Sequence, residues 1–333
     1  MSTEQGLKRV RGVSIRRIPA GHPGAGIAVV RVHYSADPTM DEGRIEVLRS
    51  KYTSDARWRR EMEIEYEALE GQLLYGEFNR EKNVVSAFDV SDREKWTIYM
   101  GLDPHPRTAH AMVWEAFNGR GDRAVCGELW PEFGTRYGPT DGIRWKTSDY
   151  AEAIQLFESD SESKPEPFEW ARGKRLSVRR RFMDTYGRAS NSDEGEDYFE
   201  TYRNLGVKLT KKAIVAGKST EEVNLHFETA LKGEDNLSKA YDGIARALMS
   251  RKYADGETAP PAMVVFRECI ETIDEFENVR FPEEEAETLR DEKPVTYRKH
   301  CLDCLAYIET ARPGFAMPRR EVKSEMPQEL VAR

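Results

Sequence analysis

The chain has 333 residues, with 51 Lys and Arg against 59 Asp and Glu, and its net charge is −8 at pH 7. Hydrophobic residues make up 39% and aromatic residues 10%, which is enough for a folded core and too much for a disordered chain. The mean hydropathy is −0.71, and no apolar run approaches the ~18 residues that a membrane helix needs. We therefore predict a folded protein without a membrane span.

Two further features concern the compartment. The N-terminus, MSTEQGLKRVRG, has no apolar segment of the kind found in secretory signals. Four cysteines in a chain of this length do not make a disulfide framework. Both observations favour a reducing cytoplasm.

The negative average charge conceals one strongly basic segment. Its basic residues lie within a single short stretch: Arg172, Lys174, Arg175, Arg179, Arg180 and Arg181. A locally basic face on an acidic protein can bind a phosphate backbone. On charge alone, solvated surface residues are the simpler interpretation.

The N-terminal section has few elements of its own. Residues 1–26 are basic and interrupted by Gly and Pro, which predicts a loose arm. A strand is expected at 27–34, and Ser54 can begin a helix whose apolar stripe runs from Trp58 to Leu69. We interpret this section as a lead-in and not as a complete domain.

From Trp96 the pattern becomes that of a sheet. Apolar strands are expected at 96–102, 110–117 and 123–130, and the turn at 118–122 predicts an antiparallel meander. Helices are then expected at 148–157, 193–204, 220–231, 242–253, 268–276 and 297–310, and strands at 176–183 and 262–266. This order predicts an α/β fold with a mixed central sheet flanked by helices, and it resembles the ribonuclease H-like fold.

Three acidic residues stand at element ends in this arrangement. Asp103 ends the first strand of the meander, Asp184 ends the strand at 176–183, and Asp303 lies near the start of the last helix. In a ribonuclease H-like fold these elements are neighbours, so the carboxylates would converge and need cations such as Mg²⁺ or Mn²⁺. Two such ions can activate a water and stabilise the leaving oxygen of a phosphodiester. Taken singly, each acid is more simply a solvated loop residue.

Other residues near these acids are candidates for accessory roles. His105 could orient a water or a phosphate, or simply be satisfied within its loop, and Arg107 could hold a phosphate through its planar guanidinium. His110 flanks the same loop. Glu128 ends the third strand near the same edge and is either an accessory acid or a surface glutamate.

The C-x-x-C pair of Cys301 and Cys304 is a weaker candidate for a metal site. Structural zinc needs four ligands, and Cys126 and Cys269 are far away in the sequence. Residues three apart on a helix face the same way, so we predict a small buried apolar pair.

The segment 101–130, GLDPHPRTAHAMVWEAFNGRGDRAVCGELW, resembles the opening of the nuclease domain of phage large terminase subunits. In that family a strand ends in Asp, a loop similar to Asp-Pro-His-Pro-Arg follows, and a hairpin leads to an end similar to Glu-Leu-Trp. Three further segments resemble later parts of that domain, in the same order: 181–187 (RFMDTYG), 263–277 (MVVFRECIETIDEFE) and 300–308 (HCLDCLAYI). Upstream, 34–78 resembles the end of the motor domain and its junction.

The resemblance implies a divalent-metal-dependent DNA endonuclease that cuts bacteriophage DNA for packaging inside the bacterial host cell. Asp103, Asp184 and Asp303 would hold two Mg²⁺ or Mn²⁺ ions. DNA would be gripped by Arg107, Arg172, Lys174, Arg175, Arg179 and Arg180. The expected partners are double-stranded DNA, a portal, a small terminase subunit and a separate ATPase chain, with no membrane involved.

The chain departs from the family pattern in two places. No complete G-x-x-x-x-G-K-[ST] loop exists, because Lys212 stands where the first glycine before Gly217-Lys218-Ser219 is required, so we expect no ATPase activity from this chain. Relatives often carry an Asp pair one turn before the residue aligned with Asp303, where this chain has Lys299 and His300. His300 could help or substitute there.

These expectations divide the chain into a basic arm with a motor-domain remnant or junction at 1–90, a nuclease domain at 91–315 and a flexible tail at 316–333. Two rival functions stay open. One is another ribonuclease H-like nuclease of the resolvase or transposase type. The other is a non-catalytic or degenerate terminase-like docking module.

Overall fold

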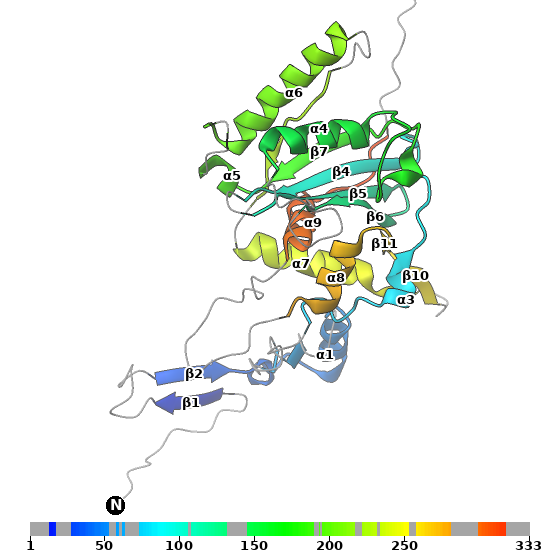
Figure 1. The fold of residues 1–333 in the computed structure, drawn as a ribbon. Coiled ribbons are helices and arrows are strands. Elements are labelled where there is room, and N and C mark those ends of the chain that lie inside the picture. Colours follow the sequence, from blue (N-terminus) through cyan, green and yellow to red (C-terminus); the bar gives the residue numbers. More distant parts are fainter. Residues whose placement is uncertain are drawn as a thin grey trace, which may run out of the picture.

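The computed structural model describes residues 13–17, 28–52, 58–59, 62–63, 73–105, 108–131, 145–189, 193, 195–216, 222–231, 234–252, 258–280 and 299–317. Its centre is a seven-stranded sheet in the order β3-β11-β6-β5-β4-β7-β8 (Figure 1). The strands are β3 (Val84–Val85), β4 (Trp96–Asp103), β5 (Ala111–Asn118), β6 (Arg123–Leu129), β7 (Val178–Met183), β8 (Glu228–Thr229) and β11 (Met263–Phe266). The predicted mixed sheet of an α/β, ribonuclease H-like fold is confirmed.

The predicted meander is β4, β5 and β6, which pair antiparallel. The turn between β5 and β6 forms because the Asn118 side chain accepts hydrogen bonds from the backbone N–H groups of Arg120 and Asp122, while Gly121 takes a positive φ of 82°. On the outer sides of the meander, β7 pairs parallel with β4 and β11 pairs parallel with β6. Parallel pairing requires crossover connections, and the intervening helices provide them.

Helices cover both faces of the sheet (Figure 1). On one face lie α4 (Thr147–Glu158) and α6 (Tyr198–Val215), and on the other lie α7 (Glu234–Leu248), α8 (Ile270–Asn278) and α9 (His300–Thr310). Because both faces are covered, every residue of β5 and β6 is buried, which explains their near-continuous apolar sequence. Within the part of the chain that the structure describes, no helix has the length and apolarity to cross a membrane.

The remaining elements are short. A separate hairpin consists of β1 (Val13–Arg17) and β2 (Ala28–Val32), and another small pair consists of β9 (Ser250–Lys252) and β10 (Thr258–Pro261). The short helices are α1 (Glu42–Arg49), α3 (Arg80–Asn83) and α5 (Tyr186–Ala189), with 3-10 turns at Tyr34–Ala36 and Glu169–Ala171.

Several sequence predictions differ from this structure. The expected helix at 220–231 is wrong where the segment is described, because Leu225 and Phe227 are buried on either side of the exposed His226. That alternation has the period of an extended chain, and the segment ends as β8. Residues 13–17, expected in a loose arm, form β1, and α1 was not predicted.

Several helix boundaries also differ from the predicted ones. The helix expected from 193 begins at Tyr198, where the Asp197 side chain accepts a hydrogen bond from the Glu200 N–H, and it continues to Val215. The helix expected at 242–253 is α7, which ends at Leu248 because the chain turns into β9. Most of the helix expected after Ser54 lies outside the described residues, although Trp58 itself is buried.

One close approach determines where α9 lies. Gly101, in the middle of β4, faces the backbone of Cys304, and a Cβ built on it would lie 2.7 Å from the Cys304 carbonyl carbon and closer still to its oxygen. Only a residue without a side chain lets the helix backbone rest directly on the strand. The contact therefore sets the distance between α9 and the end of β4.

We expect Gly101→Ala to lower the free energy of unfolding by about 1–3 kcal/mol or more, because the methyl group would push α9 off the sheet. Gly76→Ala is the matched control, since nothing lies within 4 Å of a Cβ built there. Urea denaturation of both variants measures the difference, and equal stabilities would contradict this account of the α9–β4 contact.

Candidate functional site

Two of the predicted acids lie at the ends of neighbouring strands. Leu102 of β4 pairs with Met183 of β7 in parallel register, so Asp103 and Asp184 follow side by side at the carboxyl edge. Adjacent strands lie about 4.8 Å apart, which brings the two backbones within reach of one shared ligand. Residues two apart share a face of a strand, so Asp103 lies on the same face as Gly101, beneath α9.

The Asp103 carboxylate is held by two side chains of α9. Its Oδ2 lies 2.7 Å from His300 Nδ1, and its Oδ1 accepts a hydrogen bond from the Tyr307 hydroxyl at 3.1 Å. The carboxylate is 12% exposed, so these contacts lie in a partly buried site. His300 and Tyr307 are seven residues apart on α9 and therefore share one face of the helix.

The charge of Asp103 alters the neighbouring imidazole. Burial by itself disfavours the charged His300, but the hydrogen bond and the negative charge of Asp103, with a further contribution from Asp303, raise the pKa of His300 above 6.5. Two aromatic rings border it, with Trp130 at 5.3 Å and His105 at 6.3 Å between centroids. His300 lies at the edge of the acidic site, and its imidazole is protonated more readily than its ordinary pKa would allow.

Asp184 is oriented by its own loop. The side chain is buried, and its Oδ1 accepts hydrogen bonds from the Tyr186 N–H and the Thr185 hydroxyl, both at 3.0 Å. These bonds form because β7 ends at Met183 and the chain turns at once into α5. The carboxylate orientation therefore follows from the strand end itself.

Asp303 has a different environment from the one predicted. Lys299, one turn earlier on α9, places its Nζ 2.7 Å from Oδ1 and 2.9 Å from Oδ2 of Asp303. The Tyr241 hydroxyl of α7 lies 3.3 Å from Oδ1. Both carboxylate oxygens thus face one ammonium group.

The three acids nevertheless act on one group, the Tyr307 hydroxyl. The pKa of the Tyr307 hydroxyl is raised well above 10, first by burial and then by the negative charges of Asp103, Asp303 and Asp184. Tyr307 therefore remains a protonated donor to Asp103. In the part of the chain that the structure describes, no group of three His, Cys, Asp or Glu residues is arranged to hold a metal ion.

Sequence analysis named Asp303 but gave no role to Lys299 or Tyr307, which contact the acids of this site. Lys299, Asp303 and Tyr307 follow one another at intervals of four, which places them on one face of a helix. That spacing was visible in the sequence. The contribution of Tyr241 was not, because it comes from a different helix.

Two buried glutamates position the helices beneath the sheet. Glu128 of β6 accepts hydrogen bonds from the Glu271 and Thr272 N–H groups in the first turn of α8, at 2.9 and 2.8 Å. Glu275 of α8 does the same for α9, accepting from the Cys301 and Leu302 N–H groups at 3.2 and 2.8 Å. Each carboxylate satisfies N–H groups that a helix start leaves unpaired, and each lies at the positive end of the helix dipole.

Sequence analysis gave two interpretations of Glu128, an accessory acid or a surface glutamate. The second interpretation is wrong, because the residue is buried. Its side chain is fully buried, and burial raises its pKa to about 7 against the hydrogen bonds from α8. Both of its oxygens are occupied by α8. The carboxylate therefore positions a helix, which gives it a structural role in place of a solvent-facing one.

The loop histidines separate into two environments. His105 lies beside His300, and its Nδ1 accepts a hydrogen bond from the Thr108 N–H at 3.1 Å. His110 is buried, stacks on Tyr150 at 4.5 Å and bonds the Tyr202 hydroxyl at 2.8 Å through Nδ1, so it joins β5 to α4 and α6. Arg107 lies outside the described residues.

The basic segment before Asp184 is largely paired with acids. Arg172 contacts Glu169 at 2.6 Å, Lys174 contacts Asp89 at 2.9 Å, and Arg180 holds both carboxylate oxygens of Glu228 at 2.7 and 2.5 Å. Arg181 is buried and pairs with Glu158. Arg179 is exposed and has no ion-pair partner among the described residues, while Arg175 lines a groove of about 830 Å³ beside α4 and α6.

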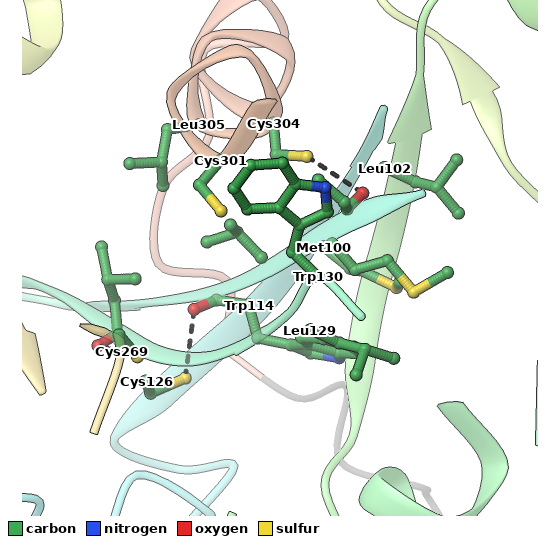
Figure 2. Packing of buried hydrophobic residues seen from close by; sticks show 14 of the residues in the cluster. Met100, Leu102, Trp114, Cys126, Leu129, Trp130, Cys269, Cys301, Cys304 and Leu305 are labelled. Carbon is green, nitrogen blue, oxygen red and sulfur yellow. Dashed lines mark hydrogen bonds between the residues drawn. The ribbon is translucent and has the colours of Figure 1, made fainter. Parts of the chain in front are cut away.

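The predicted apolar cysteine pair is confirmed. Cys301 and Cys304 are both buried, and both point from α9 toward the sheet together with Leu305 (Figure 2). Cys304 Sγ lies 3.3 Å from the Ala111 carbonyl oxygen of β5. The pair anchors α9 on the sheet.

No protein-family model matches the sequence, and no curated protein matches it. The fold does match solved structures. The large terminase from a thermophilic bacteriophage superimposes with a TM-score of 0.50 and 14% identity, over 83% of this chain and 54% of that one. Its complex with ADP gives 0.50 and 15% over 83% and 53%. The P22 large terminase nuclease domain gives 0.47 and 9% over 74% and 96%.

The fold of this chain is thus similar to that of phage large terminases, as the segment 101–130 predicted. The chain spans about half the length of the thermophilic phage protein. At such low identity the likeness establishes the fold alone.

We expect Asp103→Asn to lower the pKa of His300, because the substitution keeps the shape of the side chain and removes its charge. A pKa raised on folding means that the His300–Asp103 contact contributes stability that is fully present below pH 6.5 and is lost as the pH rises through the folded-state value. An NMR titration of the imidazole signals checks the direction. A His300 titration identical in both proteins would show that Asp103 does not act on it.

We expect the free energy of unfolding to fall as the pH rises from about 4.5 to about 7, because the folded state keeps Glu128 protonated over that interval. This shift corresponds to a contribution on the order of 3 kcal/mol. Glu128→Gln removes the titration, so its stability should depend less steeply on pH than that of the wild type. Denaturation curves measured at several pH values compare the slopes, and parallel slopes would contradict the assignment.

Proposed function

We propose that this protein is a divalent-metal-dependent DNA endonuclease of the large-terminase kind, which cuts bacteriophage DNA during genome packaging. The observation that carries the proposal is the position of Asp103 and Asp184. They end two adjacent parallel strands, beneath the same helix, in a fold similar to that of a phage large terminase. Paired carboxylates at one sheet edge suit phosphodiester hydrolysis.

The residues present fit a hard divalent cation at Asp103 and Asp184. Both supply carboxylate oxygens, which Mg²⁺ and Mn²⁺ prefer, and the two oxygens of a carboxylate together offer about four acceptor positions. Such a cation would activate a water and neutralise charge on the phosphate. Tyr307 and His300 fix the orientation of Asp103, and the Tyr186 N–H fixes that of Asp184.

We also propose that the basic segment at 172–181 contacts the DNA backbone. Arg179 is exposed, has no ion-pair partner among the described residues, and lies on β7, the strand that leads into Asp184. Arg172, Lys174 and Arg180 would bind phosphate in competition with their present carboxylate partners. Such binding should be sensitive to salt and largely independent of DNA sequence.

The partners follow from the same reasoning. Translocation of DNA requires an ATPase, and we propose an ATPase as a partner of this chain; residues 212–220 themselves lack the first glycine of a phosphate-binding loop. A portal and a small terminase subunit would complete the assembly in the cytoplasm of the bacterial host.

The test is cleavage of supercoiled plasmid with Mn²⁺, with Mg²⁺ or with EDTA. We expect the wild type to nick DNA only with a divalent ion, and Asp184→Asn to lose at least about 100-fold in rate, the factor that corresponds to a few kcal/mol of lost transition-state stabilisation. Asp160→Asn is the control, because Asp160 is exposed and lies in the loop after α4. It should cleave like the wild type.

Each other outcome identifies a rival. Folded wild-type protein that cuts nothing with any metal would favour a non-catalytic docking module. Metal-dependent cutting confined to branched DNA would favour a nuclease of the resolvase type. Equal loss of activity in Asp160→Asn and Asp184→Asn would show that the sheet edge is not the site.

A further inference from the structure

The ammonium group of Lys299 lies where a cation would have to approach Asp303. Its Nζ is 2.7 Å from one carboxylate oxygen and 2.9 Å from the other. Both side chains are largely buried, at 16% and 17% exposed. The pair is therefore a fixed feature of α9 and not a transient surface contact.

Lys299 also keeps its charge. Burial alone would favour the neutral amine, but the carboxylate of Asp303, with the nearby Tyr241, raises the pKa of Lys299 above its ordinary value. A metal ion bound to Asp303 would have to displace this ammonium or lie against it. In a partly buried site, two such positive charges repel strongly.

The charges around Tyr307 likewise disfavour a metal ion at Asp303. Asp103, Asp184 and Asp303 act on its hydroxyl, and Lys299 is paired with one of them. Three carboxylates and one ammonium leave two negative charges, which one divalent cation balances. A second divalent cation would leave two positive charges that these side chains do not compensate.

We infer that this site takes one divalent cation, between Asp103 and Asp184, and that the Lys299 ammonium takes the place of a second one at Asp303. The inference rests on the proposed function in one respect, namely that the site binds a divalent cation. It replaces the expectation of two ions held by three aspartates. Asp303 then holds Lys299 in position and is not a metal ligand.

The number of bound ions tests this directly and independently of cleavage. Mn²⁺ binding is measured by isothermal titration calorimetry, with the free ion followed by electron paramagnetic resonance. We expect one ion per wild-type chain and one per chain of Asp303→Asn, whereas Asp184→Asn should bind it at least about tenfold more weakly, as loss of a ligand implies. Lys299→Met should admit a second ion, because it frees the Asp303 carboxylate.

A double variant, Lys299→Met with Asp303→Leu, serves as the matched control if Lys299→Met alone does not fold. It removes the whole ion pair without leaving an isolated buried charge, and it should still bind one ion. Two ions in the wild type, or loss of the ion in Asp303→Asn, would overturn the inference while leaving a metal-dependent site in place. No ion bound to folded wild-type protein would overturn the proposed function itself.

Discussion

The contact of the α9 backbone with Gly101 of β4 is the constraint on which the candidate site depends. A strand residue without a side chain lets a helix lie directly on the sheet, and this places His300, Asp303 and Tyr307 over the ends of β4 and β7. The buried cysteines hold the same helix on the sheet (Figure 2), and Cys304 lies on the same helix face as His300 and Tyr307. The packing that fixes α9 on the sheet therefore also fixes the two side chains that contact Asp103.

Two buried carboxylates extend this arrangement through the helical layer. Glu128 caps α8, and Glu275, carried by α8, caps α9. The position of α9 over the sheet is thus connected by hydrogen bonds to β6, two strands away from Asp103. A carboxylate buried without a cation is costly, and here the N–H groups of helix starts and the helix dipoles offset part of that cost, although burial still raises the pKa of both groups.

The charges near Asp103 favour a site that binds one divalent cation and not two. Lys299, the residue before α9, and His300, its first residue, each contact a carboxylate of the site. A similar fold does not by itself imply a similar charge pattern. Two proteins can share a sheet and its helices while differing in how many cations they hold, because the backbone contacts depend on small and apolar residues and the cations on a few polar ones.

Local patterns of apolar and polar residues in the sequence alone were enough to predict the central strands and the two acids at their ends. The apolar runs and the Asn-Gly turn identified β4, β5 and β6, and strand ends placed Asp103 and Asp184 because a polar residue after an apolar run marks an edge. Tertiary structure decided the rest. Burial of Glu128 and the alternation at 222–231 depend on which surface each segment meets, and sequence periodicity over a short segment does not specify that. The Asp303 environment was decided by α7 and by the helical turn to Lys299, because a carboxylate binds whichever cation packing brings nearest.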